Sequence, residues 1–179
     1  MTLLKRIATY FKQDTISKFY LLTAFSFILI FEQRIISQNT SKVNWEDKAD
    51  SVILFAKSQL GIPYKWATCK PGISFDCSGF TYFSYNSVGI KSYRGSSAYS
   101  SLGHKVSLKS CRKGDCILFT GTQPEDKSIG HVGIIIENKG EKLYFIHCSS
   151  SKRHYGVVIT EFYSSNYPKR FIETRRIFD

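Results

Sequence analysis

The pattern of apolar and polar positions divides the chain near residue 44. Residues 19–31 carry no charged side chain and are almost all apolar, and three lysines and one arginine precede them. A basic flank before about thirteen apolar residues is typical of an export signal and is short for a membrane-spanning helix. We therefore expect residues 1–43 to be an export signal or a membrane anchor plus a polar linker, with a separate domain at 44–179. A buried core helix is the alternative for the apolar run.

Helical spacing of apolar residues returns after the linker. Between residues 52 and 60 the apolar positions recur every three or four residues, after Asn44 as a candidate N-cap and before a glycine that suits a helix end. A second helix is predicted over residues 77–88, because Asp76 is a good N-cap and apolar residues follow at helical spacing. A short helix is predicted over 96–102.

The second half of the chain has the pattern of strands. Its segments are rich in β-branched and aromatic residues and are separated by turns. The predicted strands are 105–108, 115–120, 131–137, 141–148, 156–162 and 170–178. Helices followed by an antiparallel meander predict an α+β domain.

The composition supports a folded domain with a basic surface. The 179 residues are 42% hydrophobic and 22% charged, which is not the composition of a disordered chain. The formal net charge of +11 favours anionic partners such as nucleic acid, a membrane surface or an anionic cell-wall polymer. The basic residues are scattered and no nucleic-acid-binding motif is present, so we expect no nucleic-acid partner. A solvated basic surface without a specific anion site is an equal alternative.

One of the five cysteines stands out by its position. An odd count leaves at least one free thiol, and the spacing predicts no particular disulfide. Cys77 directly follows Asp76 and begins a predicted helix, where unpaired backbone N–H groups and the helix dipole stabilise a thiolate. We interpret Cys77 as a catalytic nucleophile with a lowered pKa. A small buried hydrophobic residue is the alternative.

Two histidines are predicted to meet on neighbouring strands. Residues 138–140 suit a three-residue hairpin loop with its glycine in the left-handed conformation. Counting back from this loop places His131 directly opposite His147, on one face of the sheet. His131 would then be the base for Cys77, and His147 would orient its ring. A zinc site formed by the two histidines with Cys77 or Cys148 is the rival interpretation, but no CxxC or HxxxH spacing supports it.

Groups that could assist the reaction lie near these residues. The backbone N–H of Cys77 is a candidate oxyanion donor, and the Tyr64 hydroxyl is a second candidate. Tyr64 is otherwise explained as a core aromatic. Gly130 and Gly133 flank His131 and are expected to leave room for a substrate chain.

Five sequence motifs together resemble those of the NlpC/p60 family of papain-like cysteine peptidases. In order, they are LGIPYKW at 60–66, FDCSGF at 75–80, RKGDCILF at 112–119, GHVGI at 130–134 and FIH at 145–147. The resemblance covers about residues 45–178 and is greatest to the short Spr-type murein endopeptidases. It implies a papain-like α+β fold in which N-terminal helices, including the nucleophile helix, pack on an antiparallel β-sheet.

The resemblance implies a cell-wall hydrolase. The expected reaction is cleavage of an amide in peptidoglycan stem peptides, of the γ-D-glutamyl–diaminopimelate type, through a thioester acyl-enzyme. Cys77 matches the family nucleophile, His131 the base and His147 the third polar residue of the triad. The resemblance implies no cofactor and no metal. We expect an exported monomer in the periplasm or cell envelope, with attachment to the inner membrane through residues 19–31 left open.

The resemblance also implies a set of substrate-binding residues. Tyr64 matches a tyrosine beside the active site. Asp76 and Ser78 match positions that contact the free amino end of the substrate. Arg94 and Ser96 belong to a segment that resembles the one lining the family's groove.

Three departures from the family pattern leave alternatives open. Ala67-Thr68 stands where the family has two glycines, Cys148 replaces a small apolar residue next to the third triad position, and residues 123–127 form an insertion. A non-catalytic peptidoglycan-binding or regulatory module on the same fold is one alternative function. A thiol amidase or acyltransferase that acts on another bond is the other.

Overall fold

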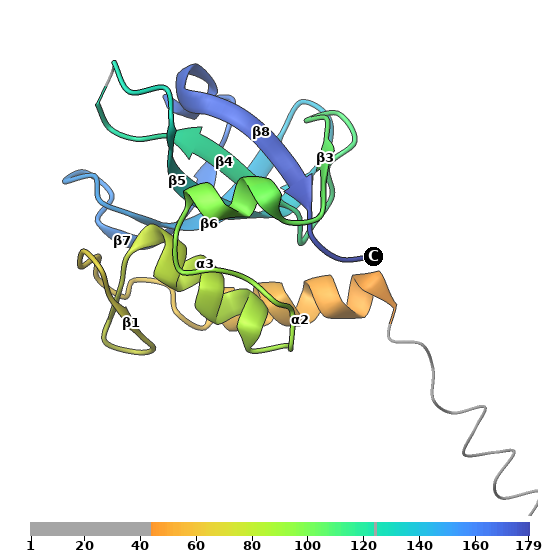
Figure 1. Cartoon of the computed structure of the whole chain (residues 1–179), viewed down its shortest axis with the longest axis horizontal. Coiled ribbons are helices and arrows are strands. Elements are labelled where there is room, and N and C mark those ends of the chain that lie inside the picture. Colours follow the sequence, from red (N-terminus) through yellow and green to blue (C-terminus); the bar gives the residue numbers. More distant parts are fainter. Residues whose placement is uncertain (1–43, 124) are drawn as a thin grey trace, which may run out of the picture. The chain divides into compact units, whose positions relative to one another are not determined.

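The computed structural model describes residues 44–123 and 125–179. Within this part of the chain two α-helices, α2 (Trp45–Lys57) and α3 (Cys77–Asn86), come first and a six-stranded antiparallel sheet follows (Figure 1). The predicted α+β class is therefore confirmed. The predicted export signal or anchor lies outside the described residues. Among the helices of the described residues, none has the length and hydrophobicity needed to cross a bilayer.

The sheet is not the simple meander that we predicted. Its strand order is β3-β8-β4-β5-β6-β7, so only β4 to β7 follow one another as a meander. The last strand, β8, returns to lie between β3 and β4, because β4 is buried over most of its length and needs a partner on each side. The strand bounds are β3 (His104–Val106), β4 (Cys116–Thr120), β5 (Ile129–Asn138), β6 (Leu143–Ser149), β7 (Gly156–Glu161) and β8 (Phe171–Arg176). A small pair that we did not predict, β1 (Cys69–Lys70) with β2 (Ser74–Phe75), precedes α3.

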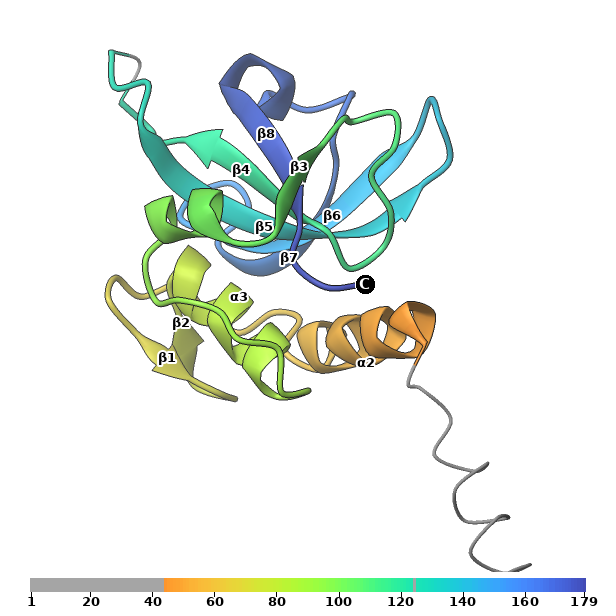
Figure 2. The same ribbon diagram turned by 45° about the vertical axis from the view of Figure 1, so that its right-hand side comes forward.

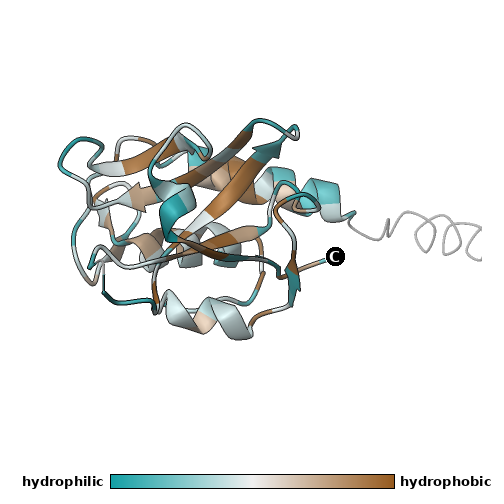
Figure 3. Ribbon diagram, turned by 90° about the horizontal axis from the view of Figure 1, so that it is seen from above, coloured by the Kyte–Doolittle hydropathy of each residue, from teal (hydrophilic) through white to brown (hydrophobic). Residues whose placement is uncertain are grey.

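Both faces of the sheet are covered by apolar packing. Helices α2 and α3 lie on one face (Figures 1 and 2), where Phe80 of α3 packs in a core with Val132 and Ile134 of β5. On the other face a second apolar cluster includes Phe119 and Phe145, and the central strands are brown in Figure 3. Since side chains alternate along β5, His131 shares this second face and lies beside Phe119.

Helix α2 buries a narrower stripe than its sequence suggests. Ala49, Val52, Ile53 and Ala56 are buried at helical spacing. Phe55 and Leu60 were expected to join this stripe, but they are 39% and 46% exposed. Phe55 lies to one side of the stripe, where its ring meets only the edge of another aromatic ring from α3.

The register between β5 and β6 differs from the prediction by two residues. Ile135 pairs with Phe145 rather than with Leu143, because the loop is longer than predicted, with β6 beginning only at Leu143, and because β5 contains a bulge after Ile135. The loop has four residues, closed by a hydrogen bond from the Lys139 N–H to the Lys142 carbonyl, 2.9 Å long. On the histidine side of the bulge, a shift of two residues keeps the side chains on their predicted face. The predicted direct pairing of the two histidines is therefore wrong, but their shared face is retained.

Candidate active site

Cys77 begins α3, as the sequence predicts. The Asp76 side chain caps the helix by accepting a hydrogen bond from the Gly79 N–H at 2.6 Å. The Cys77 sulfur is held inside the protein with only 8% of the residue exposed. The capped first turn thus directs free backbone N–H groups toward a nearly buried thiol.

The sulfur of Cys77 lies against the strand segment that carries His131. Its Sγ atom is 3.9 Å from the carbonyl oxygen of Gly130, and the backbone N–H groups of Ser78 and Val132 are placed to stabilise a negative charge on it. Gly130 and Val132 are the residues directly before and after His131. The packing of α3 against β5 therefore places the sulfur of Cys77 beside the backbone that carries the candidate base.

The pKa of the Cys77 thiol is not lowered as we expected. The pKa of Cys77 is raised to about 11, mainly by burial and to a smaller extent by the nearby Asp76 carboxylate, although the backbone N–H groups lower it. The N–H groups therefore act in the predicted direction, but burial outweighs them. An isolated thiolate is disfavoured here, and a charged sulfur needs a cation beside it.

The two histidines form a direct hydrogen bond inside the protein. The Nε2 atom of His131 lies 2.9 Å from the Nδ1 atom of His147, and the two residues are only 7% and 1% exposed. Burial lowers the pKa of His131 to about 3, with a smaller contribution from the Arg170 charge. Burial also lowers the pKa of His147 well below its usual value, and the charges of His131 and Arg170 act in the same direction.

Thr160 extends this pair into a chain of hydrogen bonds. Its Oγ1 atom lies 3.0 Å from the Nε2 atom of His147. Two arrangements of protons satisfy both bonds, and in one of them His131 Nε2–H donates to His147 Nδ1 while His147 Nε2–H donates to Thr160. This arrangement leaves Nδ1 of His131 unprotonated, which is the state a general base requires.

Tyr167 covers the histidine pair. Its ring stacks on His131 with centroids 5.8 Å apart and meets His147 edge-on at 5.1 Å. Its hydroxyl lies 3.4 Å from Nδ1 of His147, which is long for a hydrogen bond. Sequence reasoning missed Tyr167 because it follows β7 in a short 3₁₀ helix, η2 (Tyr167–Arg170), with no local signal. Sequence reasoning also missed Thr160. Because side chains alternate between the two faces of a sheet, only every second residue of the predicted strand 156–162 can reach His147.

The two glycines beside His131 do not leave room for a substrate chain. A Cβ atom on Gly133 would lie 2.8 Å from Cδ2 of Phe145 and 3.2 Å from Cβ of His147. A Cβ atom on Gly130 would lie 2.5 Å from Cα of Gly121. The space beside each glycine is therefore filled by the protein, and Gly133 allows His147 to approach β5 closely.

Three of the predicted substrate-binding residues are joined to one another. The Arg94 guanidinium lies 3.5 Å from the Asp76 carboxylate. The Ser78 hydroxyl lies 2.5 Å from the Arg94 carbonyl oxygen and 3.1 Å from Asp76 Oδ1. Asp76 and Ser78 are buried. Through these bonds they link the Arg94 segment to the first turn of α3. Ser96 lies two residues beyond Arg94, directly before η1 (Ser97–Ser101), and its side chain does not cap that helix.

Tyr64 lies on the other side of the nucleophile helix, half-buried in the loop that pairs with Phe75. The pKa of Tyr64 is raised to about 12, mainly by burial and to a smaller extent by the charges of Cys77 and Asp76. Its hydroxyl therefore stays protonated at neutral pH and can donate a hydrogen bond. A direct role for Tyr64 in substrate binding stays a prediction.

The geometry does not favour the zinc interpretation. In residues 44–123 and 125–179, no three His, Cys, Asp or Glu side chains are grouped to hold a metal ion. The facing nitrogens of His131 and His147 bond to each other, and the Cys148 thiol donates to the Phe75 carbonyl oxygen at 3.2 Å. All five cysteines are free thiols.

The comparisons with known proteins agree with this fold. The sequence profile of the NlpC/P60 family matches residues 61–176, so the chain belongs to this family. The chain is 42% identical over 88 residues to a γ-D-glutamyl-L-lysine dipeptidyl-peptidase of Bacillus cereus, an alignment that covers 49% of this chain and 26% of that protein. It is 36% identical over 92 residues to the bifunctional muramidase/DL-endopeptidase CwlT of Bacillus subtilis, covering 51% and 28%. The chain thus spans little more than a quarter of the length of these curated relatives.

Solved structures show the same fold. A crystal structure of an NlpC/P60 family protein from Bacillus cereus superposes with a TM-score of 0.64 at 34% identity, covering 73% of this chain and 40% of that chain. NlpC2 from Trichomonas vaginalis superposes with a TM-score of 0.63 at 30% identity, covering 74% and 47%. The papain-like α+β fold implied by the motifs is therefore confirmed.

Proposed function

We propose that this chain is a cysteine endopeptidase that cleaves the γ-D-glutamyl amide of peptidoglycan stem peptides. The observation that carries the proposal is the buried hydrogen bond between His131 and His147, next to a cysteine at a helix start. The names of the relatives support the bond: one is a γ-D-glutamyl-L-lysine dipeptidyl-peptidase and another a DL-endopeptidase. We infer that the bond cleaved is γ-D-glutamyl–diaminopimelate. This bond has the same γ-D-glutamyl acyl group as the bond named for the first relative.

The proposed reaction begins with attack by Cys77. The thiol proton passes to Nδ1 of His131 as Sγ bonds to the carbonyl carbon of the substrate amide. The resulting oxyanion accepts a hydrogen bond from the Cys77 backbone N–H, and the Tyr64 hydroxyl is the proposed second donor. His131 then gives its proton to the departing amine as the C–N bond breaks, which leaves a thioester on Cys77.

Water completes the cycle. His131 takes a proton from the water that attacks the thioester, and the thiolate leaves as the acid product forms. The proton on His131 then returns to the sulfur of Cys77. In each half of the cycle His131 is transiently an imidazolium, and His147 stabilises it by accepting its Nε2–H.

The same site argues against the alternative functions. A module that only binds peptidoglycan has no need for a base oriented by a second buried histidine, and burying two imidazoles lowers the pKa of both. A thiol amidase or acyltransferase would use the same residues on another bond, so only the product can distinguish it. Peptidoglycan as substrate implies an exported protein in the cell envelope. Attachment to a membrane and a monomeric state stay predictions.

Product analysis tests the proposal. The purified protein is incubated with muropeptides that contain γ-D-glutamyl–diaminopimelate and, separately, γ-D-glutamyl–L-lysine bonds, and the products are identified by mass spectrometry. We expect cleavage on the carboxyl side of D-glutamate, none with Cys77→Ala, and full activity with Cys111→Ala, which removes a thiol on the opposite face of the sheet. No cleavage by the wild-type protein, or equal cleavage by Cys77→Ala, would contradict the proposal. A cut elsewhere or an added group would indicate the amidase or acyltransferase.

A further inference from the structure

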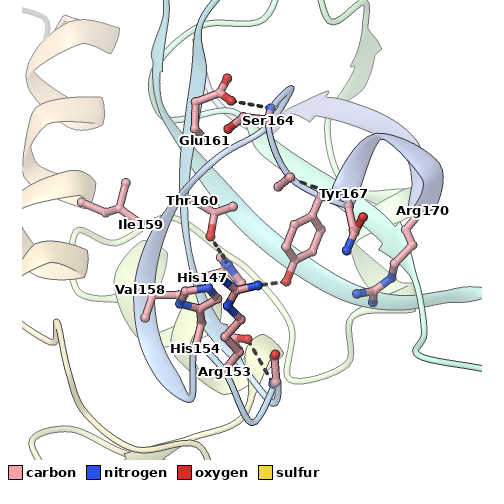
Figure 4. Close-up of a pocket in the computed structure, with 14 residues that line it drawn as sticks. His147, Arg153, His154, Val158, Ile159, Thr160, Glu161, Ser164, Tyr167 and Arg170 are labelled. Carbon is pink, nitrogen blue, oxygen red and sulfur yellow. Dashed lines mark hydrogen bonds between the residues drawn. The ribbon is translucent and has the colours of Figure 1, made fainter.

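A polar cavity of about 600 Å³ lies behind the third residue of the proposed triad. It is bounded by the loop between β6 and β7, by β7 itself and by η2, and it reaches His147 and Thr160 (Figure 4). This volume is typical of pockets that hold small molecules. The lining does not include Cys77 or His131, so the cavity adjoins the proposed active site on the side of His147 and Tyr167.

The cavity is lined by positively charged side chains. Arg153 comes from the β6–β7 loop and Arg170 from the end of η2, with His154 beside Arg153 (Figure 4). In the described part of the chain, neither arginine forms an ion pair with a carboxylate. Glu161 also lines the cavity, but its oxygens accept hydrogen bonds from the N–H groups of residues 163 and 164. The carboxylate therefore bonds to its own turn and forms no ion pair with either arginine.

Arg170 carries an unsatisfied donor at this site. Its Nη2 atom donates to the Thr120 carbonyl oxygen at 2.7 Å, and its guanidinium lies 5.2 Å from the Tyr167 ring centroid. Its Nε atom is buried and has no hydrogen-bond partner among the described residues. A buried unsatisfied N–H of a charged group is costly, so an acceptor is expected to bind there.

We propose that this cavity binds an oxyanion, a carboxylate or a phosphate, carried by a polar ligand. The two arginines supply charge-assisted hydrogen bonds, and the hydroxyl groups of Ser149, Ser151 and Ser164 line the same space for neutral polar atoms of the ligand. This binding site goes beyond the proposed hydrolysis. Because the cavity wall includes Thr160 and His147, the bound oxyanion lies next to the chain of hydrogen bonds that orients the base.

The ligand class has two chemical sources in a bacterial envelope, and defined probes separate them. Glycerol 3-phosphate represents a phosphate-bearing polymer, and N-acetyl-D-alanine represents the carboxyl end of a peptide. Each is titrated at constant ionic strength into the full-length Cys77→Ala protein, which cannot cleave, and backbone amide shifts are followed by NMR. The constant ionic strength removes the general attraction of anions to a basic surface.

We expect saturable shifts at Thr160 and Ser164 with at least one probe, and the probe that binds more tightly identifies the source. Arg153→Gln and Arg170→Gln should each weaken binding about tenfold, since each removes a charge-assisted hydrogen bond. Lys152→Gln is the matched control, because it removes the neighbouring charge outside the cavity lining, and it should leave binding unchanged. No saturable shift with either probe, or equal weakening by Lys152→Gln, would overturn the proposal. The muropeptide assay does not depend on this result, so the two proposals fail separately.

Discussion

The Nε2 atom of His131 lies 2.9 Å from the Nδ1 atom of His147, and each ring is nearly closed to solvent. With the proton of His131 on Nε2, this contact leaves Nδ1 of His131 free to accept a proton. The hydrogen bond to His147 also explains how His131 can act as a base although burial lowers its pKa to about 3. In the proposed mechanism the imidazolium forms by proton transfer from the Cys77 thiol rather than from solvent, and His147 stabilises it only when it forms.

Replacing His147 should slow the chemical step. His147→Ala removes the acceptor for Nε2–H of His131, and we expect kcat to fall about 100-fold with KM within a factor of about three. His147→Asn, which keeps an acceptor, should recover part of the loss. Steady-state kinetics on a defined muropeptide measures both constants. If His147→Ala raised only KM, the orienting role would be wrong.

The ring of Tyr167, rather than its hydroxyl, should matter for the histidine pair. Tyr167→Phe keeps the ring and should leave kcat within about threefold, because the hydroxyl contact is long at 3.4 Å. Tyr167→Ala admits water and weakens the burial that lowers the pKa of His131. That pKa then rises toward its ordinary value of about 6.5, and the acid limb of the kcat/KM profile moves to higher pH. Identical acid limbs in the two variants would contradict the covering role.

The absence of a side chain at Gly133 should be required for both stability and activity. Gly133→Ala places a methyl group 3.2 Å from Cβ of His147 and 2.8 Å from the Phe145 ring, so we expect both lower kcat and a loss of about 1–3 kcal/mol in the free energy of unfolding. Gly140→Ala is the matched control. Its φ of +72° strains an alanine by about 1 kcal/mol, but no atom lies within 4 Å of the new Cβ. Urea unfolding and steady-state kinetics should show a loss of stability in both variants and a loss of kcat only in Gly133→Ala.

Asp76 should stabilise α3 through its cap rather than through its charge. Asp76→Ala removes the acceptor for the Gly79 N–H and should cost about 1 kcal/mol of stability. Asp76→Asn keeps a capping oxygen and removes the charge, so stability should change little. Removing the charge also lowers the pKa of Cys77, because the carboxylate raises it. Urea unfolding compares the two variants, and equal destabilisation would show that the charge, not the cap, is the stabilising element.

The sequence predicts the local parts of this site well. Asp76 before Cys77 specifies a capped helix start, because the capping contact joins residues only three positions apart in the sequence. The helix begins where predicted. The common face of His131 and His147 also follows from the period of two along strands, which an error of two residues in the register does not change. The error itself comes from a loop that is longer than predicted and from a bulge after Ile135, and no local residue pattern indicates either feature.

Contacts between distant segments could not be predicted in the same way. The return of β8 beside β4 depends on which edge of the sheet most needs a partner, which becomes clear only when the sheet is assembled. Tyr167 reaches the histidine pair from η2 through the packing of the second apolar cluster. The raised pKa of Cys77 has the same origin, because burial depends on the whole fold, whereas the helix-start N–H groups are local.

The central claim concerns one proton shared by Cys77 and His131. Burial raises the pKa of Cys77 to about 11 and lowers that of His131 to about 3, so between these values the pair holds one proton and has no net charge. The proton of the thiol can then pass to His131 without exchange with solvent. In His131→Ala the sulfur must lose its proton to solvent, and its thiolate fraction rises tenfold per pH unit up to its pKa.

The rate of Cys77 alkylation by iodoacetamide as a function of pH tests this claim most directly. It is followed by mass spectrometry of the Cys77 peptide in folded wild-type and His131→Ala proteins. We predict a wild-type rate that is nearly constant between about pH 5 and 9, and a His131→Ala rate that is lower at pH 5 and rises about tenfold per pH unit. Parallel profiles in the two proteins, both rising with pH, would show that His131 does not take the proton and would contradict the account.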